Sequence, residues 1–164
     1  ADSWDDLNAT WPAQPIDLYG PGTDSGTFDY FVEVILDPTG DAITAQYFPS
    51  ENDNDLVQGV SSTAYALGYF GYAYAIENTD AIRIVPIDGG TGPVLPTAVT
   101  IRDGTYTPLS RPLFVYANAA SVARPVVQDF LRYGLSDAGT ARVDATGYVS
   151  LTAAERQAQL SKLP

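Results

Sequence analysis

The stretch Gly22 to Thr27, Gly-Thr-Asp-Ser-Gly-Thr, contains residue types that could carry two different chemistries. From Asp24 onward it matches the Asp-Ser/Thr-Gly-Ser/Thr signature of an aspartic protease, in which two neighbouring carboxylates share one proton. The same residues could instead bind an anion, because the start of a helix here would offer unpaired backbone N–H groups and the hydroxyls of Ser25 and Thr27. The surrounding sequence discriminates between these two hypotheses.

The protease hypothesis requires an all-β lobe and a second catalytic aspartate, and the chain has no second Asp-Ser/Thr-Gly. Residues 27–36, TFDYFVEVIL, have instead the apolar spacing of an amphipathic helix. A serine hydrolase elbow is also excluded, because Gly22 to Gly26 does not read Gly-x-Ser-x-Gly and the chain lacks histidine. An anion site remains, and plain helix capping by Ser25 or Thr27 explains the same residues.

The composition excludes several kinds of active site. The 164 residues include no cysteine, histidine or methionine, and one lysine, Lys162. The chain therefore cannot form a thiol nucleophile, a cysteine-based zinc site or a Ser-His-Asp triad. We expect no enzyme activity, cofactor or metal site. The segment SENDND (50–55) has carboxylates that could bind Ca²⁺, but its spacing is not that of an EF-hand loop, and helix capping is the alternative.

Charge is distributed unevenly along the chain, whose net charge is −12. Residues 1–60 contain twelve acidic residues and no basic one, and the first cation is Arg83. This argues against nucleic acid as a partner, because its phosphates are bound by lysine and arginine. No apolar run approaches the roughly 20 residues of a membrane span. The first residues lack the basic and apolar regions of a signal peptide, as in a cytoplasmic protein or in a mature or cut chain.

The elements that must position the stretch are those of an α/β fold. The expected strands lie at residues 16–20, 66–70, 82–87 and 110–118. The expected helices lie at residues 27–36, 52–61, 124–136, 137–145 and 152–163. Because the strands alternate with helices, the sequence predicts an α/β fold.

Three ordered motifs carry a resemblance to a known family. They are LYGPGTDSGTFDYF (18–31), DLVQGV with ALGYFGYAY (55–74), and RDGTYTPLSRPLFVYA (102–117). In this order they resemble the phosphate-binding proteins of bacterial phosphate ABC transporters, the PstS-like family. The resemblance runs from about Trp4 to Tyr148. It implies a periplasmic-binding-protein fold of type II, with phosphate held between two α/β lobes.

The resemblance also implies the site residues. Ser25, Gly26 and Thr27 match the triplet that donates hydrogen bonds to phosphate from a helix start, and Asp24 is a further candidate contact. Many relatives place an arginine four residues before this serine, where this chain has Pro21. Arg111 is a candidate replacement, and an interlobe or strand-end salt bridge is its alternative role.

Finally, the resemblance implies that the chain is the C-terminal part of a longer fold. Residues 1–108 would be the second half of the middle lobe, 109–112 a hinge, and 113–164 the C-terminal part of the first lobe. An N-terminal segment or a partner chain would complete both lobes. The implied function is a periplasmic or cell-envelope solute receptor that delivers phosphate to an ABC permease. The alternative is a phosphate-binding-like surface or assembly subunit that acts outside transport.

Overall fold

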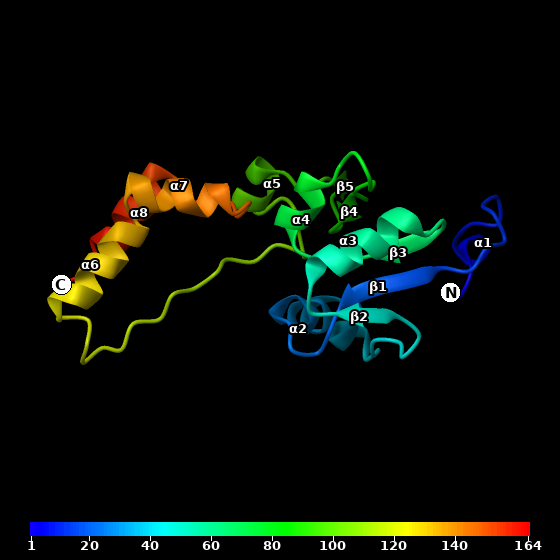
Figure 1. Cartoon of the computed structure of the whole chain (residues 1–164), viewed down its shortest axis with the longest axis horizontal. Coiled ribbons are helices and arrows are strands. Elements are labelled where there is room, and N and C mark those ends of the chain that lie inside the picture. The colour runs from blue at the N-terminus through cyan, green and yellow to red at the C-terminus, as the bar shows by residue number, and fades with distance from the viewer. The chain divides into compact units, whose positions relative to one another are not determined.

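The computed structural model describes all 164 residues, which form two compact units, Ala1–Pro86 and Ile87–Pro164. The first unit contains a parallel sheet with its connecting helices, and the second contains a two-stranded hairpin and helices (Figure 1). The elements of the first unit are α1 (Trp4–Leu7), β1 (Asp17–Pro21), α2 (Gly26–Phe31), the π-helical η1 (Val32–Leu36), the 3₁₀-helical η2 (Asp37–Thr39), β2 (Phe48–Ser50), α3 (Asp53–Ser62), β3 (Ala66–Gly68) and α4 (Tyr72–Glu77). None of the helices combines the length and the apolar character needed to cross a bilayer.

Strand β1 is the centre of the sheet in the first unit, in the order β2-β1-β3. It pairs in parallel with β2, where Tyr19 lies opposite Phe48, and with β3, where Asp17 lies opposite Ala66. Parallel neighbours require a crossover. Helix α2 with η1 and η2 connects β1 to β2, and α3 connects β2 to β3. The carboxyl ends of the strands therefore lie at one edge of the sheet, where Gly22 follows β1.

Helix α3 provides the core of the first unit, because its Leu56 and Val57 are the buried large side chains. Gly59 of α3 lets the ring of Tyr19 lie against the helix, since a Cβ at position 59 would collide with that ring. The Tyr19 ring stacks in turn on Phe48, with a centroid distance of 4.9 Å. These contacts fix α3 on strands β1 and β2.

Tyr69, directly after β3, packs against the end of β1. Gly20 leaves room for its ring, because a Cβ there would lie 2.5 Å from the ring carbon Cε1. Phe31 of α2 stacks on the same ring with a centroid distance of 4.2 Å. Burial, and to a lesser extent Tyr47, raises the pKa of Tyr69 to about 12, so its buried and unpartnered hydroxyl keeps its proton. Tyr69 thus joins β3, β1 and α2.

Capping and two inter-helix bonds organise the second unit. Its elements are β4 (Ile87–Asp88), β5 (Pro93–Val94), α5 (Ala98–Arg102), α6 (Pro125–Gly134), α7 (Asp137–Ala145) and α8 (Ala153–Leu160). Arg156 of α8 donates to the hydroxyl of Thr140 at 2.5 Å and to the carboxylate of Asp137 at 2.6 Å, both on α7. Thr152 and Glu155 form the expected capping box of α8.

Most expected elements are confirmed. Strands β1 and β3 and helices α2 with η1, α3, α6, α7 and α8 lie where the sequence predicts them, within a few residues at each end. Strand β2 was not predicted, because its three residues, Phe-Pro-Ser, give too short a signal. The predicted hinge at 109–112 and the lobes on either side of it stay predictions.

Two of the expected strands are wrong. Within 82–87, only Ile87 belongs to a strand, and it pairs across the β4–β5 hairpin. Residues 110–118 form no strand, and Figure 1 shows them as a plain tube between α5 and α6. Both segments have the apolar and β-branched residues of a strand, but no strand of this chain pairs with residues 82–86 or 110–118. Strand propensity is realised only against such a neighbour.

Candidate anion-binding site

The stretch Gly22 to Thr27 forms the turn between β1 and α2. The backbone N–H of Gly22 donates to the carbonyl oxygen of Ser50 at 3.3 Å, which extends the pairing of β1 with β2 by one residue. The N–H of Ser25 then donates back to the carbonyl oxygen of Gly22 at 3.2 Å and closes the turn. The candidate triplet is therefore held at the carboxyl edge of a parallel sheet, where α/β proteins commonly bind their ligands.

Ser25 is the N-cap of α2. Its backbone is extended (φ −101°, ψ 129°), and its Oγ accepts the N–H of Thr27 at 3.1 Å, so the capping interpretation is confirmed. A serine hydroxyl that accepts with one lone pair still carries a proton that it can donate. Ser25 and Thr27 are half-buried and Gly26 is exposed. Capping and anion binding are thus compatible at this triplet.

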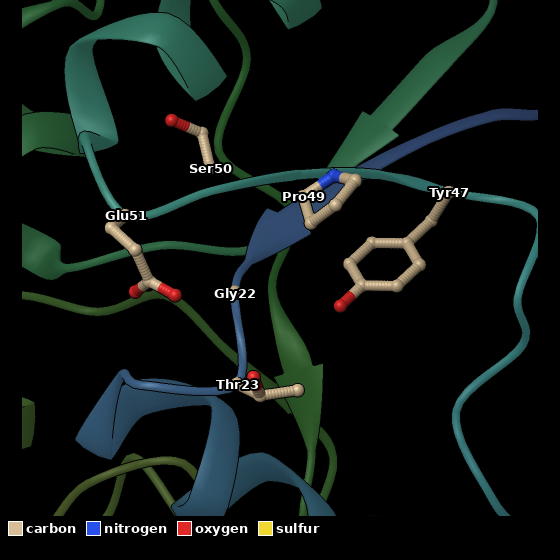
Figure 2. Close-up of a pocket in the computed structure, with 6 residues that line it drawn as sticks. All are labelled: Gly22, Thr23, Tyr47, Pro49, Ser50 and Glu51. Atoms are coloured by element: carbon tan, nitrogen blue, oxygen red, sulfur yellow. The ribbon is translucent and has the colours of Figure 1, made fainter.

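Glu51, which follows β2, holds the turn from the neighbouring strand. Its Oε1 accepts the backbone N–H of Asp24 at 3.1 Å, whereas the side chain of Asp24 is exposed. Gly22 makes room for this carboxylate, because a Cβ at position 22 would collide with Oε1. Figure 2 shows the Glu51 carboxylate directed toward the backbone of Gly22 and Thr23.

A cavity of about 350 Å³ opens beside this turn (Figure 2). It is lined by Gly22, Thr23, Tyr47, Pro49, Ser50 and Glu51. The hydroxyl of Tyr47 donates to the carbonyl oxygen of Pro21 at 3.3 Å, which fixes the aromatic wall of the cavity on the end of β1. Two of the lining residues, Gly22 and Thr23, directly precede the triplet in the sequence. The cavity therefore lies at the same edge of the sheet as the triplet.

The net negative charge of the first unit disfavours the binding of an anion. Residues 1–86 contain fourteen acidic residues and one basic residue, Arg83. Pro21, the position at which the resemblance implies an arginine in many relatives, is buried at the end of β1. Arg111 is exposed and belongs to the second unit, and its role in binding stays a prediction. With one basic residue in this unit, the donors that the triplet itself offers to an anion are hydroxyls and backbone N–H groups.

The segment Ser50 to Asp55 forms a capping network. Asn52 is the N-cap of α3, and its Oδ1 accepts the N–H of Asn54 at 3.2 Å, while the Ser50 hydroxyl donates to Asp55 at 2.9 Å. The capping interpretation of this segment is confirmed, and no group of three histidine, cysteine or acidic side chains is placed to hold a metal ion. The contact of Glu51 with the turn was missed in the sequence, and recognising β2 in the run Tyr-Phe-Pro-Ser would have been the signal for it.

Comparisons with known proteins identify relatives that include a protein named as phosphate-binding. Residues 1–138 match the family model described as a PBP superfamily domain. The chain is 43% identical over 149 residues to Protein SphX of Synechocystis sp., covering 90% of this chain and 44% of that protein. It is 37% identical over 165 residues to the phosphate-binding protein PstS of Staphylococcus saprophyticus, covering 99% of this chain and 50% of that protein. The chain spans about half the length of the curated relatives it matches.

A solved structure of similar fold also matches this chain. The protein described as a possible phosphate binding protein from Planctomyces limnophilus matches with a TM-score of 0.83 and 41% sequence identity. The match covers 99% of this chain and 58% of that chain. The α/β fold expected from the sequence is confirmed by this match.

Proposed function

We propose that this chain, which belongs to the PBP superfamily, binds inorganic phosphate as part of a solute receptor for an ABC-type phosphate importer. The resemblance of its motifs to the PstS-like family is confirmed by its relatives, which include a PstS and a SphX protein. The observation that carries the proposal is the Ser25-Gly26-Thr27 triplet, accessible at the carboxyl edge of a parallel sheet.

The triplet can bind a tetrahedral oxyanion without a cation from its own unit. The hydroxyls of Ser25 and Thr27 rotate to donate toward different oxygens of the ligand. Gly26 has no side chain, so an oxygen can approach the backbone at the start of α2, where the helix dipole favours negative charge. Glu51 keeps this turn in place through Asp24. Arg111 is a candidate for a charge-assisted contact with the ligand, and Asp24 is a further candidate contact at the turn.

Outside the triplet, the proposal follows the resemblance. The chain forms the C-terminal part of the fold, with a hinge at 109–112, and an N-terminal segment or partner chain completes the lobes and adds ligand contacts. The receptor is not an enzyme. It acts at the periplasmic or outer side of the cell envelope and delivers phosphate to the permease.

Substitution of the triplet tests the proposal. In the native full-length protein, Ser25→Ala combined with Thr27→Ala should weaken phosphate binding in calorimetric titration by several kcal/mol, at about 1–3 kcal/mol for each donor to a charged ligand. Ser136→Ala is the matched control, because Ser136 also caps a helix, α7, but has no proposed ligand contact. Unchanged phosphate affinity in the double variant would exclude the triplet as the site.

The second candidate, an assembly subunit that acts outside transport, is favoured by the many exposed apolar side chains of the second unit. Size-exclusion chromatography with mass detection separates the two functions. A large assembly that contains no phosphate supports the subunit, and a discrete receptor that retains phosphate supports transport.

A further inference from the structure

Asn8, Ala9 and Thr10 form an exposed turn directly after α1. The backbone N–H of Trp11 donates to the carbonyl oxygen of Asn8 at 2.8 Å and closes the turn. The side-chain oxygen Oδ1 of Asn8 accepts the backbone N–H of Thr10 at 3.0 Å and the Thr10 hydroxyl at 2.8 Å. The side-chain nitrogen Nδ2 of Asn8 donates no hydrogen bond within the chain. The turn therefore presents this nitrogen to solvent.

The sequence of this turn is an N-glycosylation motif. Asn-x-Ser/Thr, with any residue except proline at x, is the acceptor sequence for N-linked sugars on the surface of secreted proteins. Of the five asparagines in the chain, only Asn8 has a hydroxyl residue two positions later. A three-residue motif also occurs by chance, so the geometry of the turn must show whether this asparagine can act as an acceptor.

Asn118 provides a comparison within the same chain. It is exposed and forms the same kind of turn, in which Ser121 N–H donates to its carbonyl oxygen at 2.9 Å and Ala120 N–H donates to its Oδ1 at 2.9 Å. Ala120 lacks the hydroxyl that Thr10 directs at the Oδ1 of Asn8. The two turns therefore differ in one hydrogen bond to the asparagine side chain, and that bond comes from the motif residue.

We propose that Asn8 is the acceptor of an N-linked glycan. The sugar donor is of the class in which an oligosaccharide is joined through its anomeric carbon to a lipid phosphate, and a membrane-bound transferase catalyses the step. The inference rests on the proposed function only for the location, because a receptor outside the membrane is exported past such a transferase.

The hydrogen bonds of the turn suit Asn8 to this reaction. An amide nitrogen is a poor nucleophile because its lone pair is delocalised into the carbonyl group. Two hydrogen bonds to Oδ1 polarise the amide, so a proton of Nδ2 is easier to remove. That proton passes to a base of the transferase, Nδ2 forms a bond to the anomeric carbon, and the bond from this carbon to the phosphate oxygen breaks. The lipid phosphate leaves with the electron pair.

Exposed apolar side chains lie beside the acceptor. Trp11, whose N–H closes the turn, is 46% exposed and packs edge-on against Trp4 with a centroid distance of 5.8 Å. Leu7, directly before Asn8, is 55% exposed. The C–H groups of a sugar ring can pack on the apolar face of an indole. A glycan on Asn8 is thus placed to cover apolar surface that the chain leaves exposed.

The acceptor turn lies at the opposite edge of the sheet from the triplet. The indole Nε1 of Trp4, on α1, donates at 2.9 Å to the carbonyl oxygen of Tyr65, which directly precedes β3. Helix α1 is thereby fixed at the edge where β1 and β3 begin (Figure 1). The five residues of β1 place about 16 Å between this edge and the turn that carries the triplet. A glycan on Asn8 therefore leaves the anion site uncovered.

Peptide mass spectrometry of the native full-length protein, isolated from its own organism, tests the proposal. The first basic residue is Arg83, so trypsin releases no short peptide around Asn8, whereas cleavage before aspartate releases residues 6–16. We expect this peptide to be heavier than its sequence by at least one sugar residue, and fragmentation should place the added mass on Asn8. The peptide of residues 103–128 should carry no sugar on Asn118.

Variants expressed in the same organism separate the motif from its surroundings. Asn8→Gln and Thr10→Ala should each abolish the added mass, and Thr10→Ser should keep it, because serine restores the hydroxyl. Asn118→Gln is the matched control and should leave the added mass unchanged. Phosphate affinity of Asn8→Gln should stay within about twofold of the native value, because the substitution is on the surface and far from the triplet, and this also shows that the variant is folded.

An unmodified Asn8 in the native protein would overturn the inference. A Thr10→Ala variant that keeps its sugar would overturn it too, because the hydroxyl would then have no part in the reaction. Sugar on Asn8 in a protein that does not bind phosphate would contradict the proposed function and leave this inference standing. Phosphate binding by a protein without sugar on Asn8 would do the reverse.

Discussion

The turn that carries the candidate site depends on a fit between two residues that are far apart in the sequence. Gly22 leaves the space that the Glu51 carboxylate occupies, and that carboxylate accepts the N–H of Asp24. The backbone of Gly22 is not in the left-handed region, so alanine is permitted there as far as conformation is concerned. A side chain introduced at position 22 should therefore change the stability of the protein by displacing Glu51.

This coupling predicts a non-additive pair. Gly22→Ala and Glu51→Ala should each lower the free energy of unfolding by about 0.5–1 kcal/mol, because each removes the same exposed hydrogen bond. The double variant should be no less stable than Glu51→Ala alone, since the added methyl group then has nothing to displace. Urea unfolding measures all three. Gly134→Ala is the control, because no atom lies near a Cβ there, and additive losses in the double variant would contradict the coupling.

Among the secondary-structure elements, α8 has a titratable cap. The N–H and the hydroxyl of Thr152 both donate to Glu155 Oε2 at 2.7 Å. These bonds, the hydroxyl first and then the backbone N–H, lower the pKa of Glu155 below its ordinary value of 4.5. Because the folded form binds its proton less readily than the unfolded form, the cap contributes stability above about pH 4.5. That contribution is lost as the pH falls through the lowered pKa.

Glu155→Gln should therefore flatten the acid side of the stability profile. Glutamine keeps an oxygen that can accept both bonds but does not titrate, so the variant should lose less stability between pH 5 and pH 3 than the native sequence. Thermal unfolding monitored by circular dichroism across this range measures the difference. Asp129→Asn removes a charge from α6 without touching a cap, and an equal flattening in that variant would show that overall charge, not the capping box, causes the effect.

Helices were more predictable than strands in this protein, for a physical reason. The caps at Ser25, Asn52, Ser136 and Thr152 act within three residues, so they can be recognised in the sequence. A strand is completed by a neighbour that can lie anywhere in the chain, or outside it. Residues 82–86 and 110–118 have strand composition but no such neighbour here, whereas β2, which is three residues long, is paired with β1.

At the scale of the whole molecule, the phosphate affinity that we expect depends on how much of the family fold the chain contains. The chain covers 44–50% of its curated relatives, and the unit that contains the triplet has fourteen acidic residues and one basic residue. Because the proposed site takes further donors from the part of the fold that this chain does not span, and because the net charge repels an anion, we expect the 164-residue chain alone to bind phosphate weakly or not at all.

Calorimetric titration of the isolated chain beside the native full-length protein checks this expectation. Micromolar or tighter phosphate affinity in the isolated chain would contradict it, and would mean that the donors of this chain suffice. Raising the ionic strength with sodium chloride should strengthen any residual binding, because salt screens the repulsion between the acidic unit and the anion. Sulfate in place of phosphate tests whether this chain by itself distinguishes the two oxyanions.

The sequence by itself predicts the candidate triplet and its helix cap, because both depend on neighbouring residues. It also predicts the α/β class and the family, because these follow from the order of elements and motifs along the chain. Only the tertiary structure brought Glu51 to the turn of Gly22 and Asp24, and Tyr69 onto Gly20. Both contacts arise because parallel strands place the ends of distant segments at one edge of a sheet. The sequence predicts the candidate donors Ser25, Gly26 and Thr27, and the pairing of β1 with β2 and β3 decides which residues hold their turn in place.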